Sequence, residues 1–113
     1  MRAFVLLLLL VPGSLLAAED SHRQIDFGLK VAQKGLWQEA RFRFERALAI
    51  DPQNASALND LAVALEQMGE FDKARQSYEK ALGLKPNDLY IQQNFDLFRE
   101  ADDKRNRKSR RKK

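Results

Sequence analysis

The chain repeats itself at an offset of 34 residues across residues 21–88. Gly35 pairs with Gly69 at this offset, and Trp37 pairs with Phe71. Six further pairs of matched character are Ala40 with Ala74, Phe44 with Tyr78, Ala47 with Ala81, Leu48 with Leu82, Ile50 with Leu84 and Pro52 with Pro86. A period of this length is typical of arrays in which similar pairs of helices stack on one another.

Apolar residues three and four apart predict a helix in the first half of each repeat. The first helix is expected to begin at Ser21, which with Gln24 three residues later resembles a capping box. It is expected to end before Gly35, because glycine adopts the left-handed conformation that closes a helix. In the second repeat, Asn54 is the expected N-cap and Gly69 the expected terminator.

The second half of each repeat is also expected to be helical, from Trp37 and from Phe71 onward. Pro52 and Pro86 end these two helices, because proline cannot continue a helix and restricts the residue before it. Alanines on the same stripe would let neighbouring helices approach to about 8–9 Å. The sequence therefore predicts two helix pairs, residues 21–54 and 55–88.

Both units resemble the tetratricopeptide repeat, whose pattern has small residues, glycine, aromatic residues, alanines and proline at fixed positions. In residues 21–54 these positions hold Gly28, Gly35, Trp37, Ala40, Phe44, Ala47 and Pro52. In residues 55–88 they hold Ala62, Gly69, Phe71, Ala74, Tyr78, Ala81 and Pro86. The large aromatic residue often found at the fourth position is replaced by Gln24 and Leu58. The resemblance implies an all-α, right-handed helix-turn-helix solenoid.

Residues 89–103 continue the register of the repeats but lack a partner helix. Stacked repeats leave an apolar face open at each end, and a terminal helix with one polar side can cover it. We expect residues 89–103 to be such a capping helix, with Ile91, Phe95, Leu97 and Phe98 on the covering side.

Residues 1–18 have the layout of a secretory signal peptide. Arg2 precedes an apolar run over residues 3–11, Pro12 interrupts that run, and small residues lead up to Ala18. We expect cleavage near Ala18 and an exported protein, periplasmic or secreted. An uncleaved membrane anchor is the alternative, although the apolar run is short for a bilayer core of about 30 Å.

Residues 104–113 are strongly basic and follow an acidic body. Residues 19–103 hold 11 basic and 16 acidic residues, a net charge of −5. The basic residues of the tail are Lys104, Arg105, Arg107, Lys108, Arg110, Arg111, Lys112 and Lys113. Like charges repel one another, so we expect this tail to be disordered. It could be solvated, contact an anionic membrane or envelope surface, or bind nucleic acid, although it has no aromatic residue for base stacking.

The sequence lacks the parts of a catalytic site. His22 is the only histidine and there is no cysteine, so a nucleophile has no neighbouring base to activate it. The same scarcity of ligands gives no metal site, and no glycine-rich loop follows a strand to hold a phosphate. We therefore expect no enzyme activity, no cofactor and no metal.

The resemblance implies a concave groove lined by the first helix of each pair. Carried onto this chain, the groove residues are His22, Ile25, Leu29, Gln33, Asn59, Val63, Glu66, Gln67, Tyr90, Gln93 and Leu97. A family variant that grips a terminal carboxylate uses Lys and Asn where this chain has Ile25 and Leu29, and Asp60 would repel such a ligand. That binding mode is disfavoured here.

We expect an adaptor or scaffold that binds a protein or peptide partner in this groove. Two alternatives remain open: a homo-oligomeric component of the cell envelope, in which open helical faces meet, and a binder of nucleic acid or an anionic surface through the basic tail.

Overall fold

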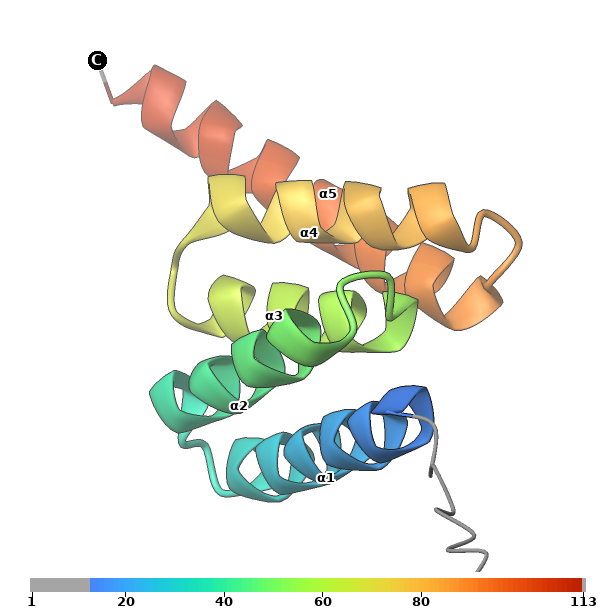
Figure 1. Ribbon diagram of the computed structural model, residues 1–113. Coiled ribbons are helices and arrows are strands. Elements are labelled where there is room, and N and C mark those ends of the chain that lie inside the picture. The colour runs from blue at the N-terminus through green and yellow to red at the C-terminus, as the bar shows by residue number, and fades with distance from the viewer. Residues whose placement is uncertain (1–12, 113) are drawn as a thin grey trace, which may run out of the picture.

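The computed structural model describes residues 13–112, with side chains from Ala17 onward. This part of the chain forms helices only: α1 (Gly13–Gln33), α2 (Trp37–Ile50), α3 (Ala55–Gln67), α4 (Phe71–Leu84) and α5 (Leu89–Arg111). α1 packs against α2 and α3 against α4, and the α2–α3 contact joins the two pairs (Figure 1). α5 contacts both α3 and α4. The all-α solenoid expected from the 34-residue repeat is confirmed.

The two turns inside the helix pairs have the same backbone geometry. Gly35 and Gly69 have φ values of 75° and 77°, which favour glycine. In each turn the following residue closes the helix, since Leu36 N donates to Val31 O at 3.0 Å and Glu70 N donates to Leu65 O at 2.9 Å. The equivalent turns explain why α2 and α4 begin at the equivalent residues Trp37 and Phe71.

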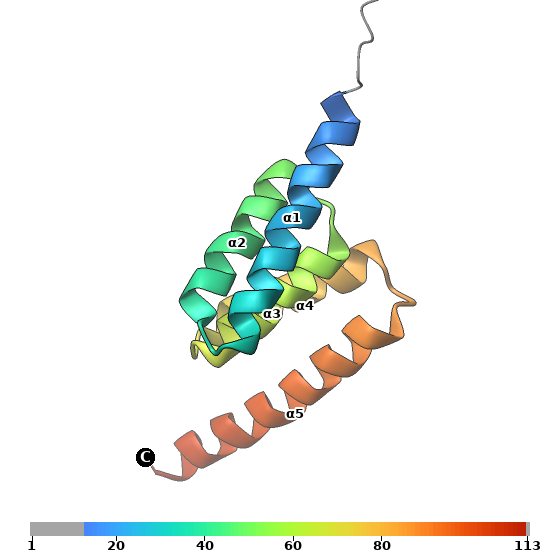
Figure 2. The ribbon, with the colours of Figure 1, turned by 90° about the horizontal axis from the view of Figure 1, so that it is seen from below.

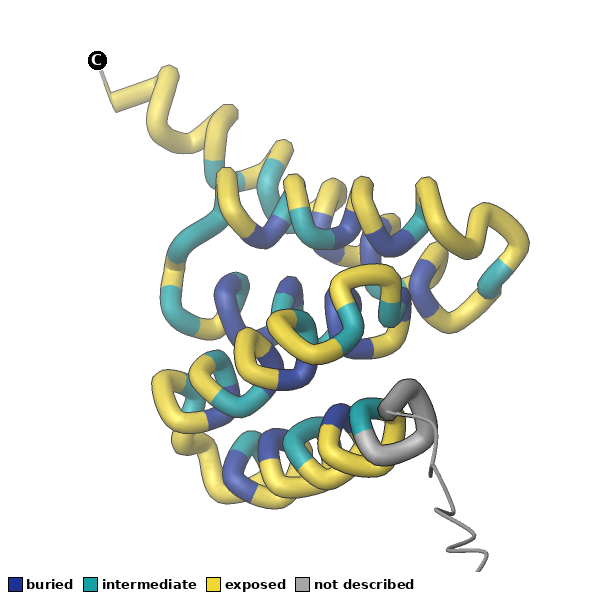
Figure 3. The backbone as a smooth tube through the Cα atoms, viewed as in Figure 1, coloured by how far each residue is buried: buried dark blue, intermediate teal, exposed yellow. Residues whose placement is uncertain are grey.

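Alanines make close packing possible inside each helix pair. Ala40 and Ala47 of α2 and Ala74 and Ala81 of α4 are completely buried. Large aromatic rings fill the space that these small residues leave, with Phe44 in the first pair and Tyr78 in the second. Figure 3 shows the buried residues as a stripe along the inward side of each helix.

α1 begins eight residues before the expected capping box. Ser21 is buried inside the helix, and its hydroxyl donates to the carbonyl of Ala47 at 3.4 Å. The predicted N-cap at Ser21 is therefore wrong, because the residues before it continue the helix. The expected cleavage site at Ala18 lies within α1, and residues 1–12 of the expected signal peptide lie outside the described residues. Asn54 does cap α3, since its side chain accepts from Ala57 N at 3.0 Å.

α5 covers the second helix pair with aromatic residues. The Phe95 and Phe98 rings lie 5.6 and 5.4 Å from the Tyr78 ring, centroid to centroid, and Ile91 is buried beside α3. Leu97 is 67% exposed, so its expected place on the covering side is wrong. Charged residues also lie on the outward side, including an ion pair between Asp96 and Arg99.

α5 also continues eight residues past its predicted end at Asp103. The expected disorder of residues 104–113 is wrong over residues 104–111, which are helical. Ion pairs one turn apart explain the difference: Glu100 and Lys104 at 3.2 Å, and Asp102 and Arg105 at 3.1 Å. Basic residues also suit the carboxyl end of a helix dipole. Both ribbon views show this end of α5 extending past the other helices (Figures 1 and 2).

Gly28 of α1 lies against the Phe44 ring of α2. A Cβ atom at this position would lie 2.6 Å from Cε1 of the buried Phe44 ring. We expect Gly28→Ala to destabilise the fold by about 1 kcal/mol, because the steric cost of about 1–3 kcal/mol exceeds the gain of about 1 kcal/mol in helix propensity.

Gly83 provides the matched control, because no atom lies within 4 Å of its Cβ position in α4. We expect Gly83→Ala to stabilise the fold by roughly 0.5–1 kcal/mol. Urea unfolding followed by circular dichroism measures both variants. Equal effects of the two substitutions would contradict the packing described around Gly28.

Candidate functional site

One hollow on the groove side is lined by residues of four helices, α1, α2, α3 and α5. It has a volume of about 280 Å³. We call it the groove hollow, and its lining residues are Leu29, Ala32, Gln33, Trp37, Phe44, Asp60, Val63 and Tyr90. They come from the α1–α2 pair, from α3 and from α5. The packing of α3 against both α1 and α5 brings these side chains together.

Four of the expected groove residues line this hollow: Leu29, Gln33, Val63 and Tyr90. Leu29 and Tyr90 are exposed and Val63 is half-buried, so each offers apolar surface to a ligand. The other accessible residues of the expected set do not line it: His22, Ile25, Glu66, Gln67, Gln93 and Leu97. The hollow therefore brings together four of the eleven expected residues.

Asn59 is not available to a ligand, which corrects its expected place in the groove. Its side chain is only 1% exposed, and its Oδ1 accepts from Asn94 Nδ2 at 3.1 Å. This bond joins α3 to α5. Glu66 is also engaged, because Tyr78 donates its hydroxyl proton to Glu66 Oε2 at 3.1 Å. Burial, followed by the charge of Glu66, raises the pKa of Tyr78.

Asp60 is the one charged residue in the lining of the hollow, and the groove assignment did not include it. It sits among apolar and aromatic side chains, and within residues 13–112 the one hydrogen bond to its side chain is from Asn59 Nδ2 at 3.5 Å. Burial raises the pKa of Asp60 to about 6, and the Asn59 hydrogen bond opposes this shift only in part. Asp60 and Glu66 are the only charged residues of α3, a signal already present in the sequence.

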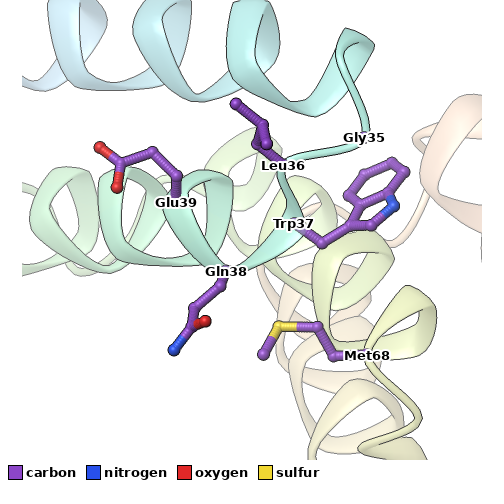
Figure 4. A pocket seen from close by; sticks show the side chains of 6 residues that line it. All are labelled: Gly35, Leu36, Trp37, Gln38, Glu39 and Met68. Atoms are coloured by element: carbon purple, nitrogen blue, oxygen red, sulfur yellow. The ribbon is translucent and has the colours of Figure 1, made fainter.

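A larger hollow of about 860 Å³ lies at the turn between α1 and α2. Gly35, Leu36, Trp37, Gln38, Glu39 and Met68 line it. In Figure 4 their side chains point in different directions, with Leu36 toward α1 and Gln38 away from it. No set of polar groups converges on one point there, so this hollow is the weaker candidate.

Comparison with known proteins agrees with this geometry. The family model for the tetratricopeptide repeat matches residues 32–93, more than half of the chain. The chain belongs to the tetratricopeptide repeat family. No curated protein matches it significantly. It is similar in structure to the C-terminal TPR-containing domain of a Plasmodium falciparum protein described as FK506-binding, with a TM-score of 0.71 and 25% sequence identity. The similarity covers 86% of this chain but only 61% of that one.

Tetratricopeptide repeats generally mediate protein–protein interaction and are typically not catalytic. In this tetratricopeptide repeat protein, the groove hollow holds a single carboxylate with no histidine, cysteine or second carboxylate beside it. Elsewhere in residues 13–112, no group of three or more potential metal ligands gathers. No helix among the same residues has the length and apolar character needed to cross a membrane.

The helical end of α5 carries the basic residues of the expected anionic-surface contact; we call residues 104–112 the basic arm. Arg105 is not free for such a contact. Its guanidinium carbon lies 3.5 Å from the Phe71 ring centroid, and it pairs with Asp102. The hydrogen bond from Arg75 at 2.8 Å, more than that from Arg105, lowers the pKa of Asp102.

Six other basic residues of the arm are exposed: Lys104, Arg107, Lys108, Arg110, Arg111 and Lys112. Lys113 lies outside the described residues.

Proposed function

We propose that this protein is an exported, non-enzymatic adaptor that binds a segment of a partner protein in the groove hollow. The observation that carries the proposal is the gathering of apolar side chains around one opening. Leu29, Val63 and Tyr90 come from three helices and remain accessible, while Phe44 of the same lining is buried. Side chains held on packed helices form a preorganised site for an apolar anchor.

The groove also offers polar groups for orientation. Gln33 lies at the edge of the hollow, and Gln67 and Gln93 are exposed on the neighbouring helices. Amide side chains can both donate and accept hydrogen bonds, so they suit the peptide groups of an extended or helical ligand. Export is supported by the apolar leader in residues 1–12, and the basic arm would add a salt-sensitive contact with an anionic surface.

We expect the double substitution Leu29→Glu and Val63→Glu to abolish partner capture, because two charges in the hollow oppose burial of an apolar anchor. The measurement is co-purification from envelope extract, with mass determination of both the captured partner and the mature chain. A measured mass that corresponds to a chain starting at the residue after Ala18 would support export. Circular dichroism checks that the double variant keeps its helices, and capture at the wild-type level would refute the groove assignment.

Self-association is the second candidate, favoured by the open end of the first helix pair. Phe27 is 44% exposed there, and Phe42 is exposed beside it, with Arg43 within 5.5 Å of both ring centroids. The equivalent of Phe27 in the second repeat is Leu61, which packs against the core of both pairs. Sedimentation separates the two candidates, because a monomer at micromolar concentration rules out self-association.

A further inference from the structure

Asp60 is placed where an ionised carboxylate lacks a counter-charge. It lines the groove hollow from α3, beside Val63 of the same helix, Leu29 of α1 and Tyr90 of α5. No salt bridge to Asp60 forms among residues 13–112, and one long hydrogen bond from Asn59 is its only side-chain partner. A carboxylate in apolar surroundings is costly unless a positive group pairs with it.

The other charges on the helices around the hollow also favour a cationic ligand. α3, the central helix of the groove, contains Asp60 and Glu66 and no basic residue. The first half of α5, residues 89–98, contains no basic residue, and its one acid, Asp96, pairs with Arg99 on the outward side. Complementary charge is what selects a partner for such a surface, so a cationic ligand is favoured and an anionic one is opposed.

Aromatic residues strengthen the preference for a cation. Trp37 and Tyr90 both line the groove hollow together with Asp60. Aromatic rings attract lysine and arginine side chains, whose aliphatic stems also pack on apolar surface. The same opening thus combines apolar surface from Leu29 and Val63, ring surface, and one negative charge.

We infer that the groove hollow recognises a lysine or arginine side chain of a partner segment, flanked by apolar residues, through an ion pair with Asp60. The inference rests on the proposed function, and it names the chemistry of the ligand. The apolar flanks fill the surface of Leu29 and Val63, and the cation reaches the carboxylate. The raised pKa of Asp60 agrees with this reading, because a bound cation would offset the cost of burying the charge.

The basic arm of a second copy fits the hollow less well. Residues 104–113 supply cations but contain no apolar residue to occupy the surface of Leu29 and Val63. A partner segment that carries both kinds of residue satisfies the whole lining. The occupant is therefore a separate protein segment of mixed basic and apolar sequence.

The test uses an array of random nine-residue peptides probed with the full chain at pH 7.5, where Asp60 is ionised. For the strongest binder, the dissociation constant is measured with the basic residue intact and with norleucine in its place. Each peptide is measured against the wild type, Asp60→Asn and Glu79→Gln. Glu79 is an exposed acid on α4 away from the hollow, so Glu79→Gln controls for the loss of one negative charge.

We expect binders enriched in lysine or arginine beside apolar residues. Asp60→Asn should raise the dissociation constant of the basic peptide about tenfold, which is the effect of losing a charge-assisted hydrogen bond. The norleucine peptide should bind the wild type and Asp60→Asn equally, and Glu79→Gln should bind like the wild type.

Three failures are distinguishable. Peptides that depend on Leu29 and Val63 but bind Asp60→Asn as tightly as the wild type would overturn the inference and leave the proposed function standing. If no peptide binds, or if Leu29→Glu with Val63→Glu changes nothing, the groove itself is refuted. Loss of self-association as the only effect of Asp60→Asn would assign the hollow to a second copy and also overturn the inference.

Discussion

Phe98→Ala should cost about 3–5 kcal/mol of the free energy of unfolding, the range for removing a fully buried aromatic side chain. Phe98 is 1% exposed, and its ring centroid lies 5.4 Å from that of Tyr78 and 6.3 Å from that of Phe95. Small domains are stable by only about 5–15 kcal/mol. We therefore expect the variant to lose most of its helical circular dichroism at moderate temperature.

Leu97 provides the control for this prediction, because it is the next residue in the chain and is 67% exposed. Leu97→Ala should change the free energy of unfolding by no more than about 0.5 kcal/mol. Chemical unfolding of both variants tests the role of α5 as the cover of the second helix pair. If Phe98→Ala were as mild as Leu97→Ala, α5 would not be part of the cooperative fold.

Asp60→Asn should stabilise the protein at pH 7.5 by about 3 kcal/mol. Burial raises the folded-state pKa of Asp60 to about 6, above the value of about 3.9 in an unfolded chain. Between these values the folded protein holds a proton that the unfolded chain has lost, so stability falls as the pH rises through this window. Asparagine removes the cost of ionisation, and the advantage of the variant should vanish near pH 4.

Asp26 gives the matched control, since it occupies the equivalent position of the first repeat and is exposed. Asp26→Asn should leave stability unchanged at both pH values. The measurement is the midpoint of thermal unfolding at pH 4 and pH 7.5 for the wild type and both variants. A constant difference between Asp60→Asn and the wild type at the two pH values would show that Asp60 does not titrate in a buried setting.

The sequence predicted the inner helices well and the outer helix ends poorly, for a physical reason. Gly35, Gly69 and Pro52 impose backbone conformations that end helices, so the limits of α2 and α4 follow from local chemistry. No such residue lies between Gly13 and Ser21 or after Asp103. There the helices continue, and in α5 the ion pairs of Lys104 and Arg105 support the helix beyond the repeat pattern.

Groove residues were predictable as a face but not in their individual exposure. Periodicity places Asn59 and Val63 on the same side of α3, yet Asn59 is sealed by its bond to Asn94, which is 35 residues away. Asp26 and Asp60 occupy the same position of the repeat. Asp60 lies on α3, and this helix contacts both α1 and α5. Burial of this kind depends on which helices pack together, which a local pattern does not record.

The polar outer side of α5 limits how large an assembly of this chain can become. Asp96 and Arg99 stand where the repeats have Ala62 and Leu65, so no further helix pair can stack there without burying charge. Within residues 13–112, the opposite end of the array, which carries Phe27, is the open one. Copies that meet through it would form a closed pair with twofold symmetry, and growth into a filament would be blocked.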